Sequence, residues 1–553
     1  MGFDAPFNGT VKGVPVVYDV SAYDGVQFDI QPGSTGQAGA VYFEVLNQET
    51  RPAGNGGTAN NGTQVDVNNN RGYILQGVGG TVVGTETALT SATQTVYVPF
   101  SMLVPKWFPE KSDCGSVTGD ACFAPIFNPK HGLGLEYSVY PDFSSTGAYD
   151  LWVDNISFYS GDNGLTPPGE TMPTFKSTGW TCTPPTFLGG TKSAAGKYLL
   201  WGYHTWKAQY LTAGPNAGEL MVKSPEVDGG SVVSEGIAYG MILSAYFNDS
   251  TTFAGLWKYW SDHTATGSLM NWCYALPSGS STGCNGNGGG SAVDADEDAA
   301  FALHLASTLS WGASYATNYT TMVGDIWTHD FDHTTSLPMY GSNAQQGSGL
   351  TNPSYFAPSF YRIFASVQPS FTGAVAAAYT ALNASLANGP LPPAWCTNGC
   401  ASAGGGGYTD SAKYQYDAHR VPWRIGIDYC WGDGGTTAQS YLAHISSTFN
   451  TDAAQGMAML FDVYNLDGSV CTSGCTETAA PNSMSLVGSA SVGALAGGST
   501  YSTFVNQGWQ FVLDGLNRGL PNLVTTKNSY YTYYNASVGL LTALTLSGNF
   551  YKP

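Results

Sequence analysis

The spacing of apolar residues changes between about residues 160 and 180, and this change limits the folds open to the chain. Before it, short runs rich in β-branched and aromatic residues alternate with turns rich in Gly and Asn, which is typical of β-strands. After it, apolar segments of helical length are joined by long irregular loops. The strand-like runs are 14–20, 26–30, 40–46, 94–100, 133–140 and 149–159, and the helix-like segments include 235–247, 297–311, 354–367, 373–387 and 535–548.

Two domains of different class follow from this pattern. At 553 residues the chain is also longer than one compact core usually allows. We expect a multi-domain protein, with an N-terminal all-β sandwich or jelly roll over 1–160 and an all-α domain over 179–553. Residues 161–178 lie in a Gly/Pro-rich stretch without periodicity, which we interpret as a linker. Several helical segments are apolar around most of their circumference, which predicts burial on more than one side and fits a toroid of helical hairpins.

The balance of charge excludes several classes of partner. The chain has 39 acidic and 19 basic residues, a formal net charge of −20. Nucleic acids and anionic membranes attract basic patches, so we expect neither as a partner. No apolar run reaches the roughly 18 residues that cross a bilayer. The opening MGFDAPFNG lacks the basic start and apolar core of a signal peptide, so we expect a mature or engineered start from which an export signal has been removed.

Eight of the ten cysteines fall into close pairs, which predicts local disulfides. Zinc is the alternative, but none of the pairs has a nearby His or second Cys pair to complete a four-ligand site. Disulfides indicate an oxidising location, so we expect a secreted protein. Cys182 and Cys430 are left over, and they either pair across the fold or stay buried as thiols. The predicted pairs are Cys114/Cys122, Cys273/Cys284, Cys396/Cys400 and Cys471/Cys475.

Three carboxylates stand out because their surroundings are poor in charge. Only 10% of the residues are charged, against about a quarter in an average globular chain. Glu235 lies in SVVSEGIAYGMIL, Asp294 in SAVDADEDAAFAL and Asp417 in YDAHRVPWRI. Carboxylates among Gly, Ala and aromatic residues have few solvating neighbours. Their pKa values can therefore be pushed apart, as an acid–base pair requires.

Each carboxylate also has a purely structural interpretation. Glu235 could open a helix that Ser234 caps, with its charge complementing the helix dipole. Asp294 belongs to a DxDxD run before a helix, where acids are common, and a calcium loop is not favoured because its Gly and final Glu are both missing. Asp417 lies three residues before Arg420, so a helix would allow a surface salt bridge. The aromatic neighbours of Asp417 suit a sugar-facing wall better than a solvated face.

Five separated motifs strengthen the catalytic interpretation: SEGIAYGM, LMNWCY, AVDADEDAAFAL, NPSYFAPSFYRIF and YDAHRVPWRIGIDY. In this order they resemble glycoside hydrolase family 8. WGYHTWKAQYL at 201–211 and YYTYYNASVGLLTALTLSGNF at 530–550 look like the opening and closing helices of that family, so the resemblance covers roughly 180–553. It implies an (α/α)6 barrel and an endo-acting, inverting hydrolase of β-1,4-glycans.

The resemblance also implies a role for each acid. Glu235 is expected to be the general acid that protonates the leaving oxygen, and Asp417 the general base that activates water. Asp294 is expected beneath the central subsite, where it holds the distorted sugar ring. Inversion independently requires one protonated and one ionised carboxyl about 6.5–9.5 Å apart, so that water fits between them.

Four further residues are predicted to bind substrate or to support the acids. Tyr355 is implied to position the water, Arg420 to keep Asp417 ionised and Trp272 to stack on a sugar ring. Tyr416 flanks Asp417 and suits the wall of a sugar-binding groove. Two positions depart from the usual family pattern: Val293 replaces Ser or Thr, and Ala299 replaces Ile or Met. These departures put local packing in doubt rather than catalysis.

We therefore expect a secreted, monomeric endo-β-1,4-glucanase acting on cellulose or mixed-linkage β-glucan, with no cofactor and with structural calcium left open. Xylan is the second choice of substrate and chitosan the third. A non-catalytic glycan-binding protein is the alternative of a different class. The N-terminal domain resembles, more loosely, β-jelly-roll carbohydrate-binding modules at YDLWVDNISFY, and a structural domain that buttresses the barrel is its alternative.

Overall fold

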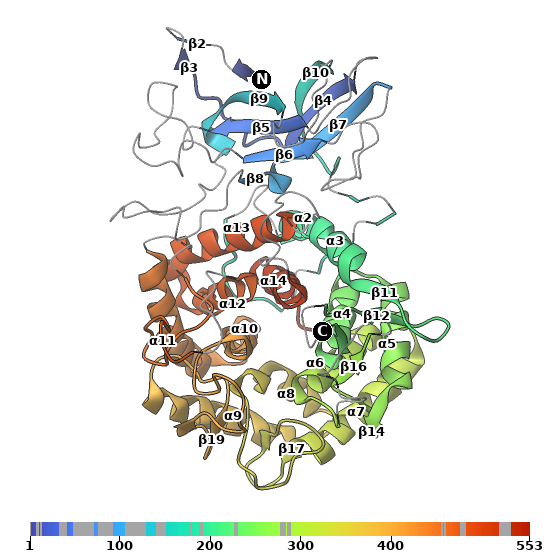
Figure 1. The fold of residues 1–553 in the computed structure, drawn as a ribbon, viewed down its shortest axis with the longest axis vertical. Helices are drawn as coiled ribbons and strands as arrows, with labels where there is room; N and C mark the ends of the chain where they lie inside the picture. The colour runs from blue at the N-terminus through green and yellow to red at the C-terminus, as the bar shows by residue number, and fades with distance from the viewer. Residues whose placement is uncertain are drawn as a thin grey trace.

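The computed structural model has β-strands in its N-terminal portion and a ring of helices in the remainder (Figure 1). It describes residues 2–6, 10–11, 14–32, 41–47, 71–75, 92–105, 129–139 and 151–553, apart from gaps at 165, 168, 172, 177–178, 187–191, 226–229, 277–283, 285–288, 455–456, 458–459, 476–482 and 519–531.

The N-terminal strands form two antiparallel sheets. The larger has the order β1-β9-β5-β6-β8 and the smaller the order β10-β4-β7. A short hairpin of β2(Thr10–Val11) and β3(Val14–Pro15) is separate. The bounds of the sheet strands are β1(Gly2–Pro6), β4(Gly25–Pro32), β5(Val41–Asn47), β6(Arg71–Leu75), β7(Gln94–Pro99), β8(Val104–Pro105), β9(Gly132–Val139) and β10(Leu151–Tyr159).

Alternating apolar residues from both sheets pack into one core. Phe28 of β4 lies with its ring centroid 5.2 Å from those of both Phe43 of β5 and Tyr137 of β9. Five of the predicted strand runs correspond to β4, β5, β7, β9 and β10, whereas the run at 14–20 contains only the two-residue β3. The sandwich or jelly-roll assignment stays a prediction, because most connections between these strands lie outside the described residues.

The helices form two concentric rings (Figure 1). The inner ring closes where its last helix, α14, packs against its first, α4. No described helix combines the length and apolarity needed to span a bilayer. The inner helices are α4(Ser234–Tyr246), α6(Val293–Thr308), α8(Pro358–Phe364), α10(Tyr416–Cys430), α12(Met484–Ala494) and α14(Tyr533–Leu546). The outer helices are α3(Leu200–Tyr210), α5(Ser250–Asp262), α7(Ala313–Asp330), α9(Phe371–Ser385), α11(Gly435–Ala453) and α13(Ser502–Arg518), and α2(Lys192–Tyr198) precedes them.

Burial separates the two rings. Every residue of α12 is buried, whereas α7 buries a single stripe of five residues. The first pattern belongs to a helix enclosed on all sides and the second to a helix with one face on the core. Close packing inside the ring depends on small residues: a methyl group on Gly426 of α10 would lie 2.7 Å from Val492 Cγ1 of α12. The prediction of helices buried on more than one side is therefore confirmed.

Inner and outer helices alternate along the chain, so the inner helices all run in the same direction. Their N-terminal ends gather at one end of the ring, and the loops that lead into them are long. These loops carry five small two-stranded sheets, while the loops at the other end are short. The small strands are β11(Leu211–Ala213), β12(Leu220–Val222), β13(Ser231–Val233), β14(Thr264–Thr266), β15(Leu269–Met270), β16(Cys273–Ala275), β17(Phe331–Asp332), β18(Leu337–Pro338), β19(Cys396–Thr397) and β20(Ser402–Ala403).

One tryptophan joins the two parts of the molecule. Trp201 of α3 packs into the core of the β-strands, and its Nε1 donates to the carbonyl oxygen of Gly164 at 2.7 Å. Helix α13 also contacts β8 and the short helix η3(Phe100–Met102). The strands therefore rest on outer helices α3 and α13 (Figure 1).

Four disulfides are present among the described residues. Three of the predicted local pairs are confirmed: Cys273–Cys284, Cys396–Cys400 and Cys471–Cys475. Cys182 and Cys430, for which two interpretations were open, bond to each other across a sequence separation of 248 residues. The predicted pair Cys114/Cys122 lies outside the described residues.

Local structure corrects three details of the sequence prediction. Helix α6 begins at Val293 rather than 297, so Asp294 lies within the helix instead of before it. The segment 354–367 is divided into η5(Pro353–Tyr355) and α8, because Pro358 disfavours helical geometry at the residue before it. Ser234 does not cap α4; it is the first helical residue, and its N–H donates to the carbonyl oxygen of Trp272 at 2.9 Å.

Candidate active site

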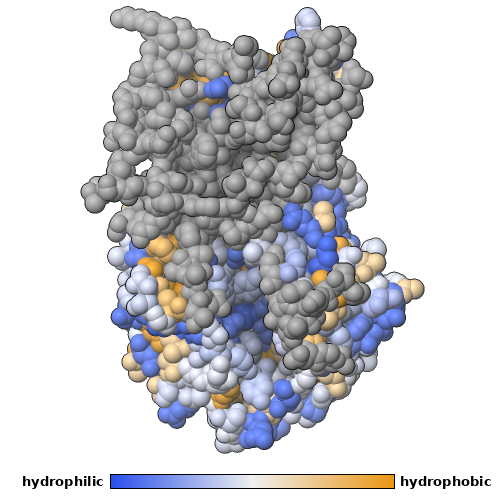
Figure 2. Space-filling view, in the orientation of Figure 1, coloured by the Kyte–Doolittle hydropathy of each residue, from blue (hydrophilic) through white to orange (hydrophobic). Residues whose placement is uncertain are grey.

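Each predicted acid is the second residue of an inner helix. Glu235 occupies this position in α4, Asp294 in α6 and Asp417 in α10. The first backbone N–H groups of a helix have no partner within the helix, and they favour negative charge. Because the inner helices run in the same direction, their starts bring carboxylates far apart in sequence to one end of the ring. Hydrophilic residues gather near the middle of the helical part in the space-filling view (Figure 2).

Arg420 lies at the centre of this group. Its Nη1 donates to Glu235 Oε2 at 2.7 Å and also contacts Asp294 Oδ2. Its Nη2 lies 3.5 Å from Asp417 Oδ1 and donates to Ser354 Oγ at 2.9 Å. The Arg420 side chain is only 2% exposed. One buried guanidinium therefore connects the three acids, and its shorter contacts go to Glu235 and Asp294 rather than to Asp417.

Glu235 is held from both sides. Tyr533, the first residue of α14, donates its hydroxyl to Glu235 Oε1 at 2.9 Å, while Arg420 binds the other oxygen. Burial raises the pKa of Glu235 to about 7, with Asp294 and Asp417 adding to the rise and Arg420 and Tyr533 opposing it. This carboxyl can therefore hold a proton near neutral pH and release it to a bound group.

Asp417 has a more open position. Its side chain is 37% exposed, against 20% for Glu235 and 6% for Asp294. Partial burial raises the pKa of Asp417 above its usual value, while the positive charge of Arg420 and the polar groups of the nearby Trp395 and Asn352 side chains oppose the rise. Exposure leaves room for water at this carboxylate, which is the position that a base acting on water requires.

The three predicted aromatic residues differ in how closely they approach the acids and Arg420. Tyr355 of η5 is buried, with its ring centroid 5.8 Å from the Arg420 guanidinium carbon. Trp272 is tied to the site by its backbone, since its carbonyl accepts from Ser234, the residue before Glu235. Tyr416 directly precedes Asp417, and its carbonyl accepts the Tyr534 hydroxyl at 2.7 Å. The structure thus brings Tyr355 into direct contact with Arg420 and leaves Trp272 and Tyr416 beside the acids.

Sequence reasoning missed several residues of the site. Tyr239 lies four residues after Glu235 on α4, and its hydroxyl is 3.3 Å from Arg420 Nη1. Its helical spacing within SEGIAYGM was a usable signal. Tyr533 lies in the 530–550 segment that resembles the closing helix of the family, but that pattern did not place it beside Glu235. Trp395 comes from a segment that no local pattern marked.

A second ion pair joins α10 and α6 one helical turn further along both helices. Arg424 Nη2 donates to Asp298 Oδ2 at 2.8 Å, its Nη1 contacts Oδ1, and both side chains are buried. His419, the residue before Arg420, is also buried, and burial lowers its pKa to about 3. This imidazole stays neutral and is not a further acid or base near pH 7. Among the described residues, no three His, Cys, Asp or Glu side chains are arranged to hold a metal ion.

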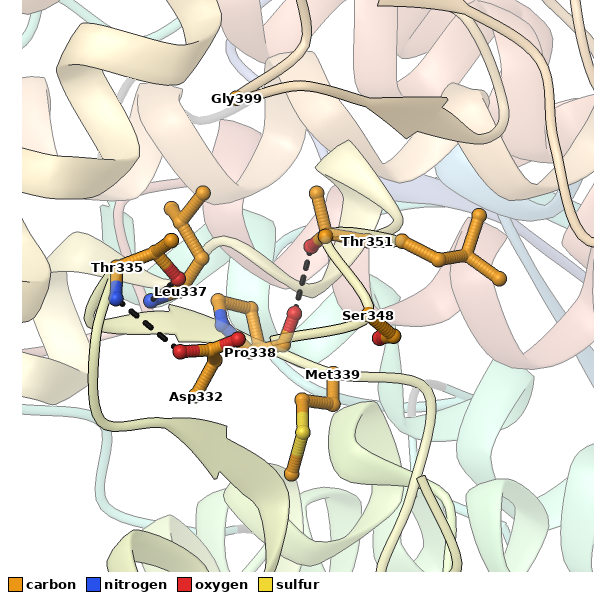
Figure 3. Close-up of a pocket in the computed structure, with 10 residues that line it drawn as sticks. Asp332, Thr335, Leu337, Pro338, Met339, Ser348, Thr351 and Gly399 are labelled. Atoms are coloured by element: carbon orange, nitrogen blue, oxygen red, sulfur yellow. Dashed lines mark hydrogen bonds between the residues drawn. The ribbon is translucent and has the colours of Figure 1, made fainter. Parts of the chain in front are cut away.

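The structure also has a pocket that none of the three acids lines. It is formed around β18 and the segment 348–351, with Leu337, Met339 and Thr351 among its lining residues (Figure 3). Asp332 lines it too, but its oxygens accept from the backbone N–H groups of Thr334, Thr335 and Gly347. None of the seven predicted site residues borders this pocket.

A double ring of paired helices is the (α/α)6 barrel, and carboxyls of unequal proton affinity at one end of it are what a glycoside hydrolase needs. The sequence model of the glycosyl hydrolases family 8 matches residues 172–548. The chain belongs to glycosyl hydrolase family 8, as the five sequence motifs indicated.

Named relatives agree with this membership. Endoglucanase A of Acetivibrio thermocellus is 30% identical over 383 residues, which cover 67% of this chain and 73% of that protein. The beta-glucanase of Niallia circulans is 28% identical over 65% of this chain and 87% of that protein. Among solved structures, the beta-1,3-1,4-glucanase from Paenibacillus sp. X4 superposes with a TM-score of 0.56 at 25% identity, covering 69% of this chain and 98% of that one. A cold-adapted family 8 xylanase shares the fold at a TM-score of 0.52 and 19% identity, covering 68% and 98%.

Proposed function

We propose that this chain is an endo-acting, inverting glycosidase that cleaves internal β-1,4 bonds of cellulose or mixed-linkage β-glucan. The observation that carries the proposal is the junction of Glu235, Asp294 and Asp417 on one buried guanidinium. Such a junction keeps three acids within one site while giving them different partners and exposures. Inversion needs this inequality, because one carboxyl must be protonated while the other is ionised.

In the proposed reaction, Glu235 gives its proton to the glycosidic oxygen as the bond from that oxygen to the anomeric carbon breaks. A water on the opposite face of the sugar forms the new bond to the anomeric carbon, and Asp417 takes its proton. Asp294, held by Arg420, supports the sugar ring at the centre of the site. Tyr355 is proposed to orient the water, since its ring lies against Arg420.

The choice of glucan rests on the relatives, whose names include endoglucanase and beta-glucanase at 28–31% identity. Xylan is the alternative substrate, with chitosan after it. A non-catalytic glycan-binding protein has less support, because the raised pKa of Glu235, about 7, serves proton donation and has no evident use in binding alone.

Two measurements test the proposal together. Reducing-sugar release is compared across soluble cellulose, mixed-linkage glucan, xylan and chitosan, and proton NMR follows the anomer formed first. We expect the fastest release from a β-glucan and early appearance of the α-anomer. Faster release from xylan would change the substrate, an early β-anomer would exclude inversion, and no release from any polymer would leave a binding protein.

For the rest of the chain, we propose domain boundaries at 1–160, 161–178 and 179–553. We also propose that the protein is secreted, since all described cysteines are in disulfides.

We propose further that the β domain binds polysaccharide. Trp152 of β10 is 70% exposed and lies opposite Gln31 of β4, which gives a flat apolar ring beside a hydrogen-bonding side chain. Trp152→Ala should reduce adsorption to insoluble glucan and leave turnover of soluble glucan unchanged. Unchanged adsorption would assign the domain a structural role.

A further inference from the structure

Only one large apolar side chain of the described helical part is exposed, and it lies near the acids. Exposed side chains of this kind are Trp152 and Ile156 on β10, and Tyr408, which is 44% exposed. Tyr408 follows the glycine run 404–407, in the loop between β20 and α10. This loop leads into α10, whose second residue is Asp417.

The Tyr408 ring is held in place although it is exposed. It stacks on Trp395 with ring centroids 4.3 Å apart and an angle of 20° between the planes. The loop is hydrogen-bonded to Trp395 on both sides: Gly404 N–H donates to the Trp395 carbonyl at 2.7 Å, and Trp395 N–H donates to the Ser411 carbonyl at 2.9 Å. Gly406 has a φ of +69°, and a methyl group there would lie 2.5 Å from Tyr408 Cε2. Glycine therefore lets the backbone pass beside the ring.

Trp395 connects this exposed ring to the catalytic centre. Its ring meets Tyr355 edge-on at 5.8 Å, and the Tyr355 ring centroid in turn lies 5.8 Å from the guanidinium carbon of Arg420. The next residue, Cys396, pairs through its backbone with Thr351, which precedes the NPSYF segment that carries Tyr355. An unbroken line of aromatic rings thus runs from Tyr355 through Trp395 to Tyr408.

A fourth aromatic residue, Tyr340, lies close to Tyr408. Partial burial raises the pKa of the Tyr408 phenol, and the neighbouring Tyr340 phenol and Asp417 carboxylate raise it further. Tyr340 is itself only partly buried and comes from the loop after β18. Tyr408 therefore lies within electrostatic range of Asp417 and of a second phenol.

We propose that Tyr408, backed by Trp395, is a sugar-stacking subsite that extends the substrate groove outward from Asp417. This inference rests on the proposed function and adds the subsite to it. Sugar rings present flat C–H faces that pack on aromatic planes, and a ring braced from behind loses little freedom when a sugar covers it. Because Trp395 links Tyr408 to the site of the acids, we expect the sugar that covers Tyr408 to belong to the same β-glucan chain that is cleaved there.

The subsite is tested with β-1,4-linked gluco-oligosaccharides of increasing length. Tyr408→Ala should raise KM by about 3- to 10-fold for the longer oligosaccharides, as expected for loss of one aromatic contact, and leave the shortest cleaved one unaffected. Tyr408→Phe, which keeps the ring, should restore the wild-type KM. The control Tyr501→Ala removes a half-buried ring at the other end of the barrel. Any change that it causes in KM should be the same for every oligosaccharide length.

Calorimetric binding separates this proposal from the proposed function. In a Glu235→Gln background, Tyr408→Ala should weaken binding of the longest gluco-oligosaccharide by the same factor. Wild-type chain that cleaves no β-glucan would overturn the proposed function, whatever the binding result. Cleavage by the wild type, combined with unchanged binding and KM in Tyr408→Ala, would overturn the subsite. An equal rise in KM at every oligosaccharide length would do the same.

Discussion

Two arginines on α10 make a natural comparison. Arg420 and Arg424 lie one turn apart and contact Asp294 and Asp298, one turn apart on α6. Arg424 gives both of its terminal nitrogens to a single carboxylate, and that pair is buried. Arg420 divides the same nitrogens among three carboxylates and the Ser354 hydroxyl.

The difference lies in how completely each charge is matched. A bidentate buried pair matches one positive charge with one negative charge, so it has little charge left to offer a ligand. A shared guanidinium matches three carboxylates with one positive charge, and burial then raises the pKa of Glu235 to about 7. Helices α6 and α10 are thus joined by two ion pairs of different kinds. The Asp298–Arg424 pair stabilises the fold and, by our proposal, the Asp294–Arg420 pair takes part in catalysis.

Removing the proposed acid or base should have the largest effect. Glu235→Gln and Asp417→Asn should each lower kcat by about 10²- to 10⁴-fold, because each takes away one proton transfer. The assay is release of reducing ends from soluble β-glucan, with thermal unfolding to verify the fold. Asp262→Asn, an exposed carboxylate of α5 paired with Lys258, is the matched control and should keep full activity. Normal activity in either site variant would refute its assignment.

Breaking the Asp298–Arg424 pair should reduce stability rather than activity. Asp298→Ala leaves the Arg424 charge buried without its partner, which should reduce the free energy of unfolding by about 3–5 kcal/mol. Urea denaturation followed by circular dichroism measures this loss. The kcat of the protein that remains folded should stay close to the wild-type value. A variant with normal stability and lost turnover would contradict the division between the two turns.

Exchanging each arginine for lysine sharpens the comparison. Lysine keeps the charge but cannot span several carboxylates, so Arg420→Lys should lower kcat by about 10- to 100-fold. Glu235 would lose part of the interaction that lowers its pKa, so the basic limb of the kcat/KM profile should move to higher pH. Arg424→Lys is the control, and its pH profile should match that of the wild type. Equal shifts in both variants would show that the two arginines are not distinct in function.

The smallest expected effect is a gain in stability. A carboxyl whose pKa rises on folding destabilises the folded state as pH increases from its unfolded value of 4.5 toward about 7. Glu235→Gln cannot ionise, so its melting temperature should exceed that of the wild type at pH 8 and approach it at pH 4. Scanning calorimetry at both values tests this. A wild type that is more stable than the variant at pH 8 would mean that the Glu235 charge is well compensated.

Local sequence singled out the three carboxylates because their signals are local. Charge-poor contexts and five ordered motifs pointed to Glu235, Asp294 and Asp417, and the spacing of three residues on a helix put Arg420 beside Asp417. Helical and strand segments were likewise readable from their periodicity. The apolar pattern alone predicted one continuous helix over 354–367, and it did not reveal the break before Pro358.

The closure of the ring could not be read in this way. Tyr533 binds Glu235 across 298 residues because the last inner helix returns to the first. Arg420 was expected to serve Asp417, its neighbour in sequence, yet its shorter contacts reach Glu235 and Asp294 on other helices. Such partnerships depend on where α4, α6 and α14 meet, and no spacing along the chain encodes that meeting.

The Cys182–Cys430 bond joins the segment that precedes the first helices to the end of α10, bypassing 248 residues of chain. A single proteolytic cut anywhere between these cysteines would therefore leave both fragments covalently attached. Four of the inner helices, α4, α6, α8 and α10, lie within that bypassed stretch, and α10 ends at Cys430 itself. In an environment rich in proteases, a nicked enzyme would keep its parts together long enough for their packing to hold the barrel closed, and a reducing agent would remove that safeguard.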